Sequence, residues 1–341
     1  MKTSDFDYEL PESFIAQTPV EPRDSSRLLV LHRDSGGIEH RIFRDIGDYQ
    51  RPGDALVLNQ TRVIPARLYA RKPTGGRVEL LLLRRRDATS WEALVGGKGL
   101  SPGRVIQVEA GPKAEIVEEL NGSERLVRFE TPIEPYFPKI GNVPLPPYIH
   151  EKLADPERYQ TVYAHEPGSA AAPTAGLHFT PPLMQALAAQ GIRLAYVTLH
   201  VGLDTFAPVT EDDPQEHKIH TEWCELDQDT AEVVNATREQ GERIVAVGTT
   251  SVRTLESAAR SASLAGSAHI AAYSGPTDLF ILPGFRFGLV DAMVTNFHLP
   301  KSTLLMLVSA FAGRETILRA YEAAKQDGYR FYSFGDAMLI I

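Results

Sequence analysis

The segment Arg243-Ile-Val-Ala-Val-Gly-Thr-Thr-Ser251 decides the class of fold. Its run of apolar residues is typical of a buried strand, and Gly248 marks the turn that ends the strand. Beyond this turn a helix is expected to about Ser261. A strand that leads through a tight turn into a helix is the repeating unit of layered α/β proteins.

Strands and helices alternate in the same way from about Pro147 to the end of the chain. One helix is well delimited, because Thr180 can cap it, Pro181 stands in its first turn and Gly191 can end it. Further strands are expected at 193–201, 269–273, 278–282 and 291–295, and further helices at 230–240, from Ser302 onward and at 315–326. This alternation predicts helices layered on a mainly parallel sheet.

A different pattern fills the middle of the first half. Short β-rich runs separated by turn residues occur at 77–84, 91–95, 104–109, 114–117 and 126–129. Such spacing is typical of a small all-β barrel or sandwich.

The first 60 residues offer a short helix at 11–16 and strands at 28–31 and 55–58, which are too few for a domain. We therefore predict an α/β main domain formed by residues 1–60 together with 150–341. A β-barrel domain at 61–149 is then inserted between its two parts.

Charge and composition limit the class of protein. The net charge is −9, which argues against a general nucleic-acid binder, yet residues 59–114 hold 11 Lys and Arg against 4 Asp and Glu. The apolar run at 304–312 is far shorter than the ~20 residues of a membrane-spanning helix. The acidic N-terminus and the single Cys224 fit a cytoplasmic protein without a membrane segment. We expect Cys224 to be a small buried residue without a catalytic role.

The turn at 248–251 is a candidate anion site. Free backbone N–H groups and the helix dipole favour a carboxylate or phosphate at such a place, and Arg253 on the first turn could hold a carboxylate with two hydrogen bonds. Ordinary capping of the helix by Thr250 or Ser251 explains the same residues. No Gly-x-Gly-x-x-Gly turn follows a strand, so the common dinucleotide-binding pattern is absent.

The cluster His217, His220 and Glu222 could supply metal ligands. Its spacing matches no strong zinc signature, and the nearby acids at 211–213 suggest a solvated loop. A substrate-binding loop or a structural turn is the competing interpretation.

Three histidines stand beside chain breakers in loops of the α/β part. His178 and His298 each lie next to a predicted helix start, and His200 precedes Val201 and Gly202. Loops at these places commonly form ligand sites. Histidine in a loop is also often a packed or hydrogen-bonding residue.

Taken together, these stretches resemble the S-adenosylmethionine:tRNA ribosyltransferase-isomerase family over nearly the whole chain. The most specific are Ala171-Ala-Pro-Thr-Ala-Gly-Leu-His-Phe-Thr180, Thr198-Leu-His-Val-Gly202, Val247-Gly-Thr-Thr-Ser-Val-Arg-Thr-Leu-Glu256, Thr295-Asn-Phe-His-Leu-Pro-Lys-Ser-Thr-Leu-Leu-Met306 and Tyr329-Arg-Phe-Tyr-Ser-Phe-Gly-Asp-Ala-Met-Leu339. Ala170 stands where the family pattern often has Val, and Asp204 where glycine is common.

The resemblance implies transfer and isomerisation of the ribosyl group of S-adenosylmethionine onto 7-aminomethyl-7-deazaguanine at the tRNA wobble position. Epoxyqueuosine forms, and adenine and methionine leave. S-adenosylmethionine is then a co-substrate, and no permanently bound cofactor or metal is implied. The expected partner is a tRNA that carries this base, and the expected state is a monomer.

Such a reaction needs proton transfer and stabilised oxyanions. We expect His178, His200 and His298 to be proton-transfer groups, and Thr174 and Asn296 to be hydrogen-bonding groups. Thr249, Thr250 and Arg253 are expected to hold the methionine carboxylate. Two other classes compete with this interpretation: a non-enzymatic RNA-binding protein, and a metal-dependent hydrolase that uses His217, His220 and Glu222.

Overall fold

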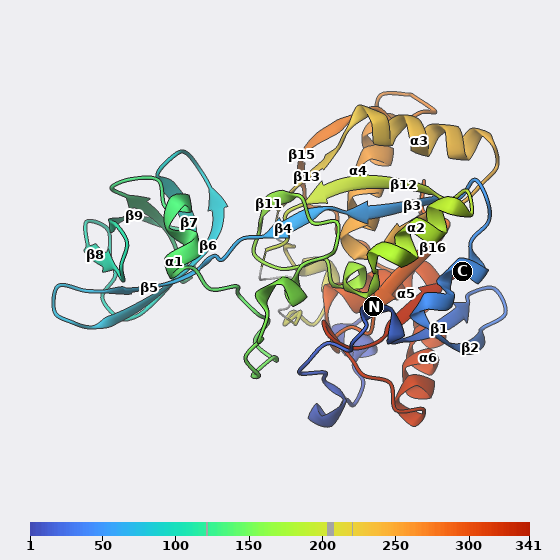
Figure 1. The fold of residues 1–341 in the computed structure, drawn as a ribbon, viewed down its shortest axis with the longest axis horizontal. Helices are drawn as coiled ribbons and strands as arrows, with labels where there is room; N and C mark the ends of the chain where they lie inside the picture. Colours follow the sequence, from blue (N-terminus) through green and yellow to red (C-terminus); the bar gives the residue numbers. More distant parts are fainter. Residues whose placement is uncertain (121, 203–207, 220) are drawn as a thin grey trace. The chain divides into compact units, whose positions relative to one another are not determined.

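The computed structural model describes residues 1–120, 122–202, 208–219 and 221–341. The chain forms two compact units (Figure 1). The main unit comprises residues 1–61, 147–166 and 172–341, and the barrel unit comprises 62–146 and 167–171. An α/β unit and a closed β-barrel confirm the predicted fold class. Residues 167–171 join the barrel unit, although the sequence placed them in the main domain.

A nine-stranded sheet forms the centre of the main unit, in the order β15-β13-β12-β3-β14-β16-β17-β1-β2. Its strands are β1 Arg27–His32, β2 Gly37–Ile42, β3 Ala55–Asn59, β12 Arg193–Leu199, β13 Glu222–Leu226, β14 Ile244–Val247, β15 Tyr273–Thr277, β16 Ala292–Asn296 and β17 Ala337–Ile340. The strands β12, β3, β14 and β16 run parallel, as does the pair β17 and β1. The other four pairings are antiparallel. The sheet is therefore mixed, and the expectation of a mainly parallel sheet was too simple.

Helices cover both faces of this sheet. They are α2 Pro181–Ala189, α3 Gln228–Glu239, α4 Thr249–Leu264, α5 Thr303–Ala312 and α6 Arg314–Gln326. Apolar residues of α3, α4, α5 and α6 share one core with Val57 and Ala246, whereas α2 shares the opposite core with Leu56 and Val245. Successive residues of a strand point to opposite faces, which is why neighbours in sequence enter different cores. The result is a three-layer arrangement.

Two predicted helix starts are confirmed by their caps. The Thr180 hydroxyl accepts a hydrogen bond from the backbone N–H of Leu183, and the Ser302 hydroxyl accepts one from Leu305. Short 3₁₀ turns connect the larger elements: η1 Thr3–Phe6, η2 Glu12–Phe14, η3 Arg23–Ser25, η4 Phe43–Tyr49, η6 Pro156–Tyr159, η7 Thr174–His178 and η9 Pro214–Glu216.

The barrel unit is a closed barrel of six antiparallel strands, in the order β10-β7-β6-β5-β8-β9. Its strands are β5 Arg67–Arg71, β6 Arg77–Arg85, β7 Ser90–Gly96, β8 Val105–Val108, β9 Lys113–Glu119 and β10 Glu124–Phe129, followed by η5 Glu134–Tyr136 and α1 Phe137–Ile140. Alternate residues such as Leu80, Leu82 and Val127 are fully buried, so the barrel has its own core. The short strands β4 Thr61–Val63 and β11 Glu166–Ser169 pair with each other.

Several helices and strands of the structure differ from those predicted from the sequence. The expected helix at 11–16 is only the turn η2, and the expected strands at 269–273 and 278–282 are replaced by β15. Pro276 within β15 is tolerated because β15 is an edge strand, where a missing N–H costs no ladder bond on the open side. Ala170 is buried, and Asp204 lies outside the described residues.

Candidate active site

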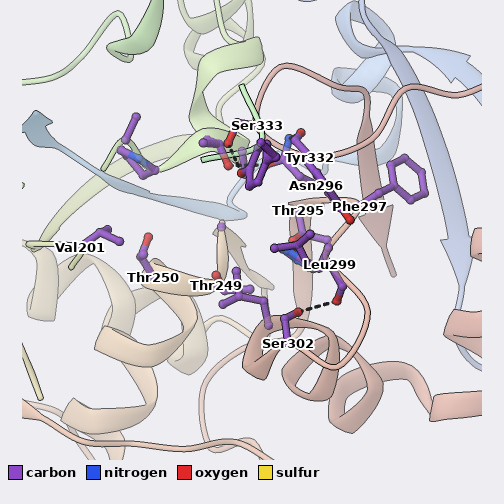
Figure 2. A pocket seen from close by; sticks show the side chains of 18 residues that line it. Val201, Thr249, Thr250, Thr295, Asn296, Phe297, Leu299, Ser302, Tyr332 and Ser333 are labelled. Carbon is purple, nitrogen blue, oxygen red and sulfur yellow. Dashed lines mark hydrogen bonds between the residues drawn. The ribbon is translucent and has the colours of Figure 1, made fainter. Parts of the chain in front are cut away.

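A pocket lies in the main unit at the carboxyl ends of parallel strands (Figure 2). Gly248 follows β14, Asn296 ends β16 and Val201 follows β12. Ligands of open α/β sheets bind at this edge. The lining residues are Tyr148, Ala172, Pro173, Thr174, Ala175, Val201, Gly248, Thr249, Thr250, Thr295, Asn296, Phe297, His298, Leu299, Ser302, Leu304, Tyr332 and Ser333.

The N-terminus of α4 forms one wall of the pocket. Gly248 caps the helix with a φ of 87°, a conformation that favours glycine. Because Gly248 offers no side-chain acceptor, the first-turn N–H groups at Thr249 and Thr250 are not capped by it. The Thr250 hydroxyl is buried and has no hydrogen-bond partner among the described residues. This wall therefore presents donors to an acceptor that enters the pocket.

A second helix also begins at the pocket. Ser302 caps α5, and its hydroxyl donates to the Leu299 carbonyl at 2.7 Å (Figure 2). The same hydroxyl accepts from the backbone N–H of Leu305. The hydroxyl is thus already committed to the helix end. The positive end of the α5 dipole still adds to the potential that favours an anion here.

Thr174 and Asn296 lie together on the pocket wall. The Thr174 hydroxyl donates to Asn296 Oδ1 at 2.9 Å. The Nδ2 atom of Asn296 lies 3.2 Å from His178 Nε2 and 3.4 Å from the Tyr332 carbonyl oxygen. The two residues predicted as hydrogen-bonding groups are therefore brought into one network that reaches the pocket.

His298 lines the pocket as a neutral imidazole. Its Nε2 atom lies 2.7 Å from Thr295 Oγ1, and its backbone N–H donates to the Tyr321 hydroxyl at 2.9 Å. The Tyr8 hydroxyl donates to the His298 carbonyl. Burial lowers the pKa of His298 to about 3. The histidine is thus held in a fixed orientation beside the pocket.

His178 does not line this pocket, contrary to the expectation that it projects into the cleft. It lies behind Asn296, its Nδ1 atom is 2.7 Å from Ser26 Oγ, and its ring stacks on Phe43 at 5.0 Å. Burial is the main cause that lowers its pKa to about 3, and the charges of Arg330 and Arg23 add to it. The motif that contains His178 thus contributes Thr174 to the pocket, and His178 supports it from behind.

The third histidine, His200, also lies outside the pocket lining. Its Nδ1 atom is 2.8 Å from Thr61 Oγ1, and burial lowers its pKa. The structure therefore does not group His200 with His298 and Asn296.

The structure gives Arg253 other partners than a ligand. Its guanidinium forms an ion pair with Glu222 and donates from Nε to the Leu279 carbonyl at 3.1 Å. It also donates to the Thr277 carbonyl at 3.4 Å. Both side chains of the ion pair are 7% exposed, and Arg253 does not line the pocket with Thr249 and Thr250. Arg253 therefore lies apart from Thr249 and Thr250, because the α4 face that carries it packs against β13 and β15.

The proposed metal cluster is not described in full. His217 contacts Glu211, Glu222 pairs with Arg253, and His220 lies outside the described residues. Within the described ranges, no three His, Cys, Asp or Glu side chains are grouped as metal ligands would be. Cys224 is fully buried in β13, and burial raises the pKa of its thiol to about 11.

Sequence reasoning missed an aromatic wall. Tyr148 and Tyr332 line the pocket with ring centroids 4.8 Å apart, and the Tyr148 hydroxyl lies 2.7 Å from Ser333 Oγ. Tyr332 has a φ of 70°, which is rare for a bulky residue and typical of functional sites. Tyr332 lies in one of the stretches that carried the family resemblance, but the residue types of the two tyrosines alone gave no reason to assign a role.

An α/β unit with a polar, partly aromatic pocket at the carboxyl edge of its sheet has the arrangement of an α/β enzyme, which binds its substrate at this edge. The chain belongs to the family of queuosine biosynthesis proteins, whose model matches residues 3–340.

Relatives share the whole length of the chain. S-adenosylmethionine:tRNA ribosyltransferase-isomerase of Symbiobacterium thermophilum is 55% identical over 346 residues, and that of Dehalococcoides mccartyi is 52% identical over 348 residues; each alignment covers 100% of both chains. The crystal structure of S-adenosylmethionine tRNA ribosyltransferase from Thermotoga maritima has a TM-score of 0.57 and 43% identity, and the match covers 99% of this chain and 100% of that one.

Proposed function

We propose that this chain transfers and isomerises the ribosyl group of S-adenosylmethionine onto 7-aminomethyl-7-deazaguanine at the wobble position of a tRNA. Epoxyqueuosine is formed, and adenine and methionine leave. The observation that carries the proposal is the full-length identity of 55% to a relative of that name. S-adenosylmethionine is a substrate in this reaction.

The methionine carboxylate binds at the N-terminus of α4. The uncapped N–H groups of the first turn and the positive end of a 16-residue helix favour an anion, and the buried Thr250 hydroxyl needs a partner. A carboxylate oxygen satisfies both requirements. Arg253 stabilises this helix against β13 through Glu222 and does not contact the ligand.

The aromatic wall receives a planar ring. Offset or tilted stacking on Tyr148 or Tyr332 suits either adenine or the deazaguanine base. The sulfonium group acidifies the adjacent C–H of the ribosyl group, so a base can remove that proton, and the substrate amine is itself a candidate. Departure of adenine needs a proton donor, and developing sugar oxyanions need hydrogen-bond donors.

His298 is the histidine best placed for these steps, because it lines the pocket and is oriented by Thr295. A neutral imidazole with a strongly lowered pKa serves as a hydrogen-bond donor to a developing oxyanion rather than as a stored proton. We assign His298 this role.

The barrel unit contributes to tRNA binding. Residues 62–146 hold 14 Lys and Arg against 10 Asp and Glu, in a chain whose net charge is −9. Many of these cations are paired within the barrel, as Arg86 is with Glu92 and Arg128 with Glu115. Arg84 is exposed and has no ion-pair partner among the described residues, so it is free to contact a phosphate.

The protein acts as a monomer in the cytoplasm, where tRNA is modified. Its one cysteine is buried and unpaired, as is usual in a reducing compartment. Within the described part of the chain, every helix is too short or too polar to cross a bilayer.

One assay distinguishes this proposal from its two alternatives. The protein is incubated with S-adenosylmethionine and tRNA that carries the precursor base. Release of adenine and methionine supports the enzyme. Binding of tRNA without release supports a non-enzymatic RNA-binding protein, and hydrolysis that a chelator stops supports a metal-dependent hydrolase.

A further inference from the structure

A line of four polar side chains runs from the interior of the main unit to the pocket. Ser26 and His178 are 2.7 Å apart, His178 and Asn296 are 3.2 Å apart, and Asn296 and Thr174 are 2.9 Å apart. Ser26, His178 and Asn296 are each less than 5% exposed. Only Asn296 and Thr174 reach the pocket.

The direction of the hydrogen bonds in this line is set at Asn296. Its Nδ2 atom lies 3.4 Å from the backbone carbonyl of Tyr332, which can only accept a hydrogen bond. Turning the amide over would place its oxygen against that carbonyl oxygen. The nitrogen of Asn296 therefore stays on this side, and Oδ1 faces Thr174.

The same argument fixes the tautomer of His178. The Asn296 amide nitrogen has only protons to offer, so Nε2 of His178 must accept with its lone pair. The ring proton then resides on Nδ1 and is donated to Ser26 Oγ. A second proton on Nε2 would point at the Asn296 amide, and burial, together with the charges of Arg330 and Arg23, lowers the pKa of His178 to about 3.

At the pocket end of the line, the orientation of the Asn296 amide determines the hydrogen bond that Thr174 makes. Its hydroxyl proton is donated to Asn296 Oδ1, which has no proton of its own. The Thr174 oxygen therefore offers only lone pairs to the pocket. It accepts a hydrogen bond from a ligand and cannot donate one.

We propose that His178 is a positioning residue that fixes the amide of Asn296 and so makes Thr174 Oγ1 an obligate acceptor for a hydroxyl or amino donor of the substrate. The proposal rests on the proposed function and deepens it, because it states which chemical group one wall of the site selects. The donor is a ribosyl hydroxyl of S-adenosylmethionine or the aminomethyl group of the tRNA base.

The first test compares His178→Gln with His178→Asn. The amide of Gln reaches the place of Nε2 and can accept from Asn296, whereas the amide of Asn reaches only the place of Nδ1 and contacts Ser26. Both variants lose the stacking on Phe43 equally. We expect His178→Gln to retain near-parental single-turnover chemistry and His178→Asn to lose about tenfold, the scale of one well-made hydrogen bond.

Two results overturn the proposal while the parent enzyme remains active. Equal large losses in both variants, with normal folding, would make His178 a proton-transfer catalyst. Equal losses of thermal stability with normal rates in the folded fraction would make it merely structural. Failure of the parent enzyme to release adenine would instead contradict the proposed function.

The second test identifies the substrate group that donates to Thr174 Oγ1. It uses Thr174→Val, which removes the hydroxyl, and Thr174→Ser, which keeps it. Binding of S-adenosylmethionine alone is measured by calorimetry, and the KM for tRNA is measured separately. About tenfold weaker S-adenosylmethionine binding by Thr174→Val, rescued in Thr174→Ser, assigns the donor to the ribosyl group. An unchanged S-adenosylmethionine affinity with a raised KM for tRNA assigns it to the base. No change in either measurement overturns the proposal.

A third measurement is independent of activity. Nitrogen NMR of histidine-labelled protein, with the His178 signals assigned by their loss in His178→Gln, should show a protonated Nδ1 and an unprotonated Nε2 at neutral pH. A protonated Nε2 would contradict the inferred direction of the hydrogen bonds.

Discussion

The Nε2 atom of His178 lies 3.2 Å from the Nδ2 atom of Asn296, with the Tyr332 carbonyl fixing which end of the Asn296 amide faces the histidine. This contact makes His178 a neutral acceptor buried behind the pocket. Of the three histidines expected at the site, His298 is the one that lines the pocket.

Folding stability should fall in mild acid because of His178. Its pKa is lowered on folding from 6.5 to about 3, so the unfolded chain binds a proton that the folded chain does not bind in this range. The contribution of His178 to the free energy of unfolding is therefore present above pH 6.5 and is lost as the pH falls towards 3. Between pH 7 and pH 5 this group alone should remove about 2 kcal/mol from the free energy of unfolding.

Urea unfolding of the parent and of His178→Gln at pH 7 and pH 5 measures this contribution. The variant should lose about 2 kcal/mol less than the parent over the interval. Ser26→Ala is the matched control, because it removes the partner of Nδ1 and keeps the imidazole. Identical acid losses in the parent and His178→Gln would show that His178 protonates freely in the folded protein.

Breaking the buried ion pair of Arg253 with Glu222 should lower the free energy of unfolding rather than directly weaken substrate binding. Arg253→Met leaves a buried carboxylate without its cation, which costs about 3–5 kcal/mol. Adding Glu222→Gln to that variant should restore part of the loss. Urea unfolding of the parent, Arg253→Met, Glu222→Gln and the double variant measures the coupling. A stable Arg253→Met protein that no longer binds S-adenosylmethionine would instead place Arg253 at the ligand.

Thr250 should show opposite effects on stability and binding. Its hydroxyl has no hydrogen-bond partner in the part of the chain that the structure describes, so Thr250→Val should leave the melting temperature unchanged or raise it. S-adenosylmethionine binding should weaken about tenfold. Thr254→Val is the matched control on the same helix: its hydroxyl donates to the Thr250 carbonyl at 3.0 Å, and it does not line the pocket. Calorimetry that finds parental affinity in Thr250→Val would remove Thr250 from the carboxylate site.

Arg84 should carry salt-dependent tRNA binding. Arg84→Ala should reduce the slope of log K against log salt by ~0.7, the value for one single-strand phosphate contact. Arg128→Ala provides a control in the same barrel, because Arg128 is exposed but already pairs with Glu115 at 2.7 Å. Equal slopes for the parent and Arg84→Ala, from filter binding over a salt series, would exclude this contact.

Local signals in the sequence predicted much of the fold. The caps Thr180 and Ser302 and the Gly248 turn depend on residues within four positions, and the structure contains all three. The strands β13 and β17 were missed because their burial depends on partners far along the chain. Thr277 of β15 opposes Glu222, for example, across 55 positions that offer no local pattern.

The candidate site was likewise predictable where it depends on local sequence and not where it depends on distant partners. Thr249, Thr250 and Asn296 stand directly at strand ends, so their place at the sheet edge followed from the order of elements. Arg253 was assigned to a ligand because its partner Glu222 is 31 positions away in a strand that the sequence did not reveal. Likewise, no pattern near His178 indicates Ser26, which is 152 positions away.

The most direct measurement follows the atoms of S-adenosylmethionine. Substrate labelled with ¹³C in its ribosyl group and, in a parallel sample, in its methyl group is reacted with precursor-containing tRNA in a single turnover. Mass spectrometry of the digested tRNA should find the ribosyl label in the modified base, with adenine and methionine released in equal amounts and the methyl label retained in methionine. Methyl label in the tRNA, or tRNA left unlabelled by both substrates, would contradict ribosyl transfer by this protein.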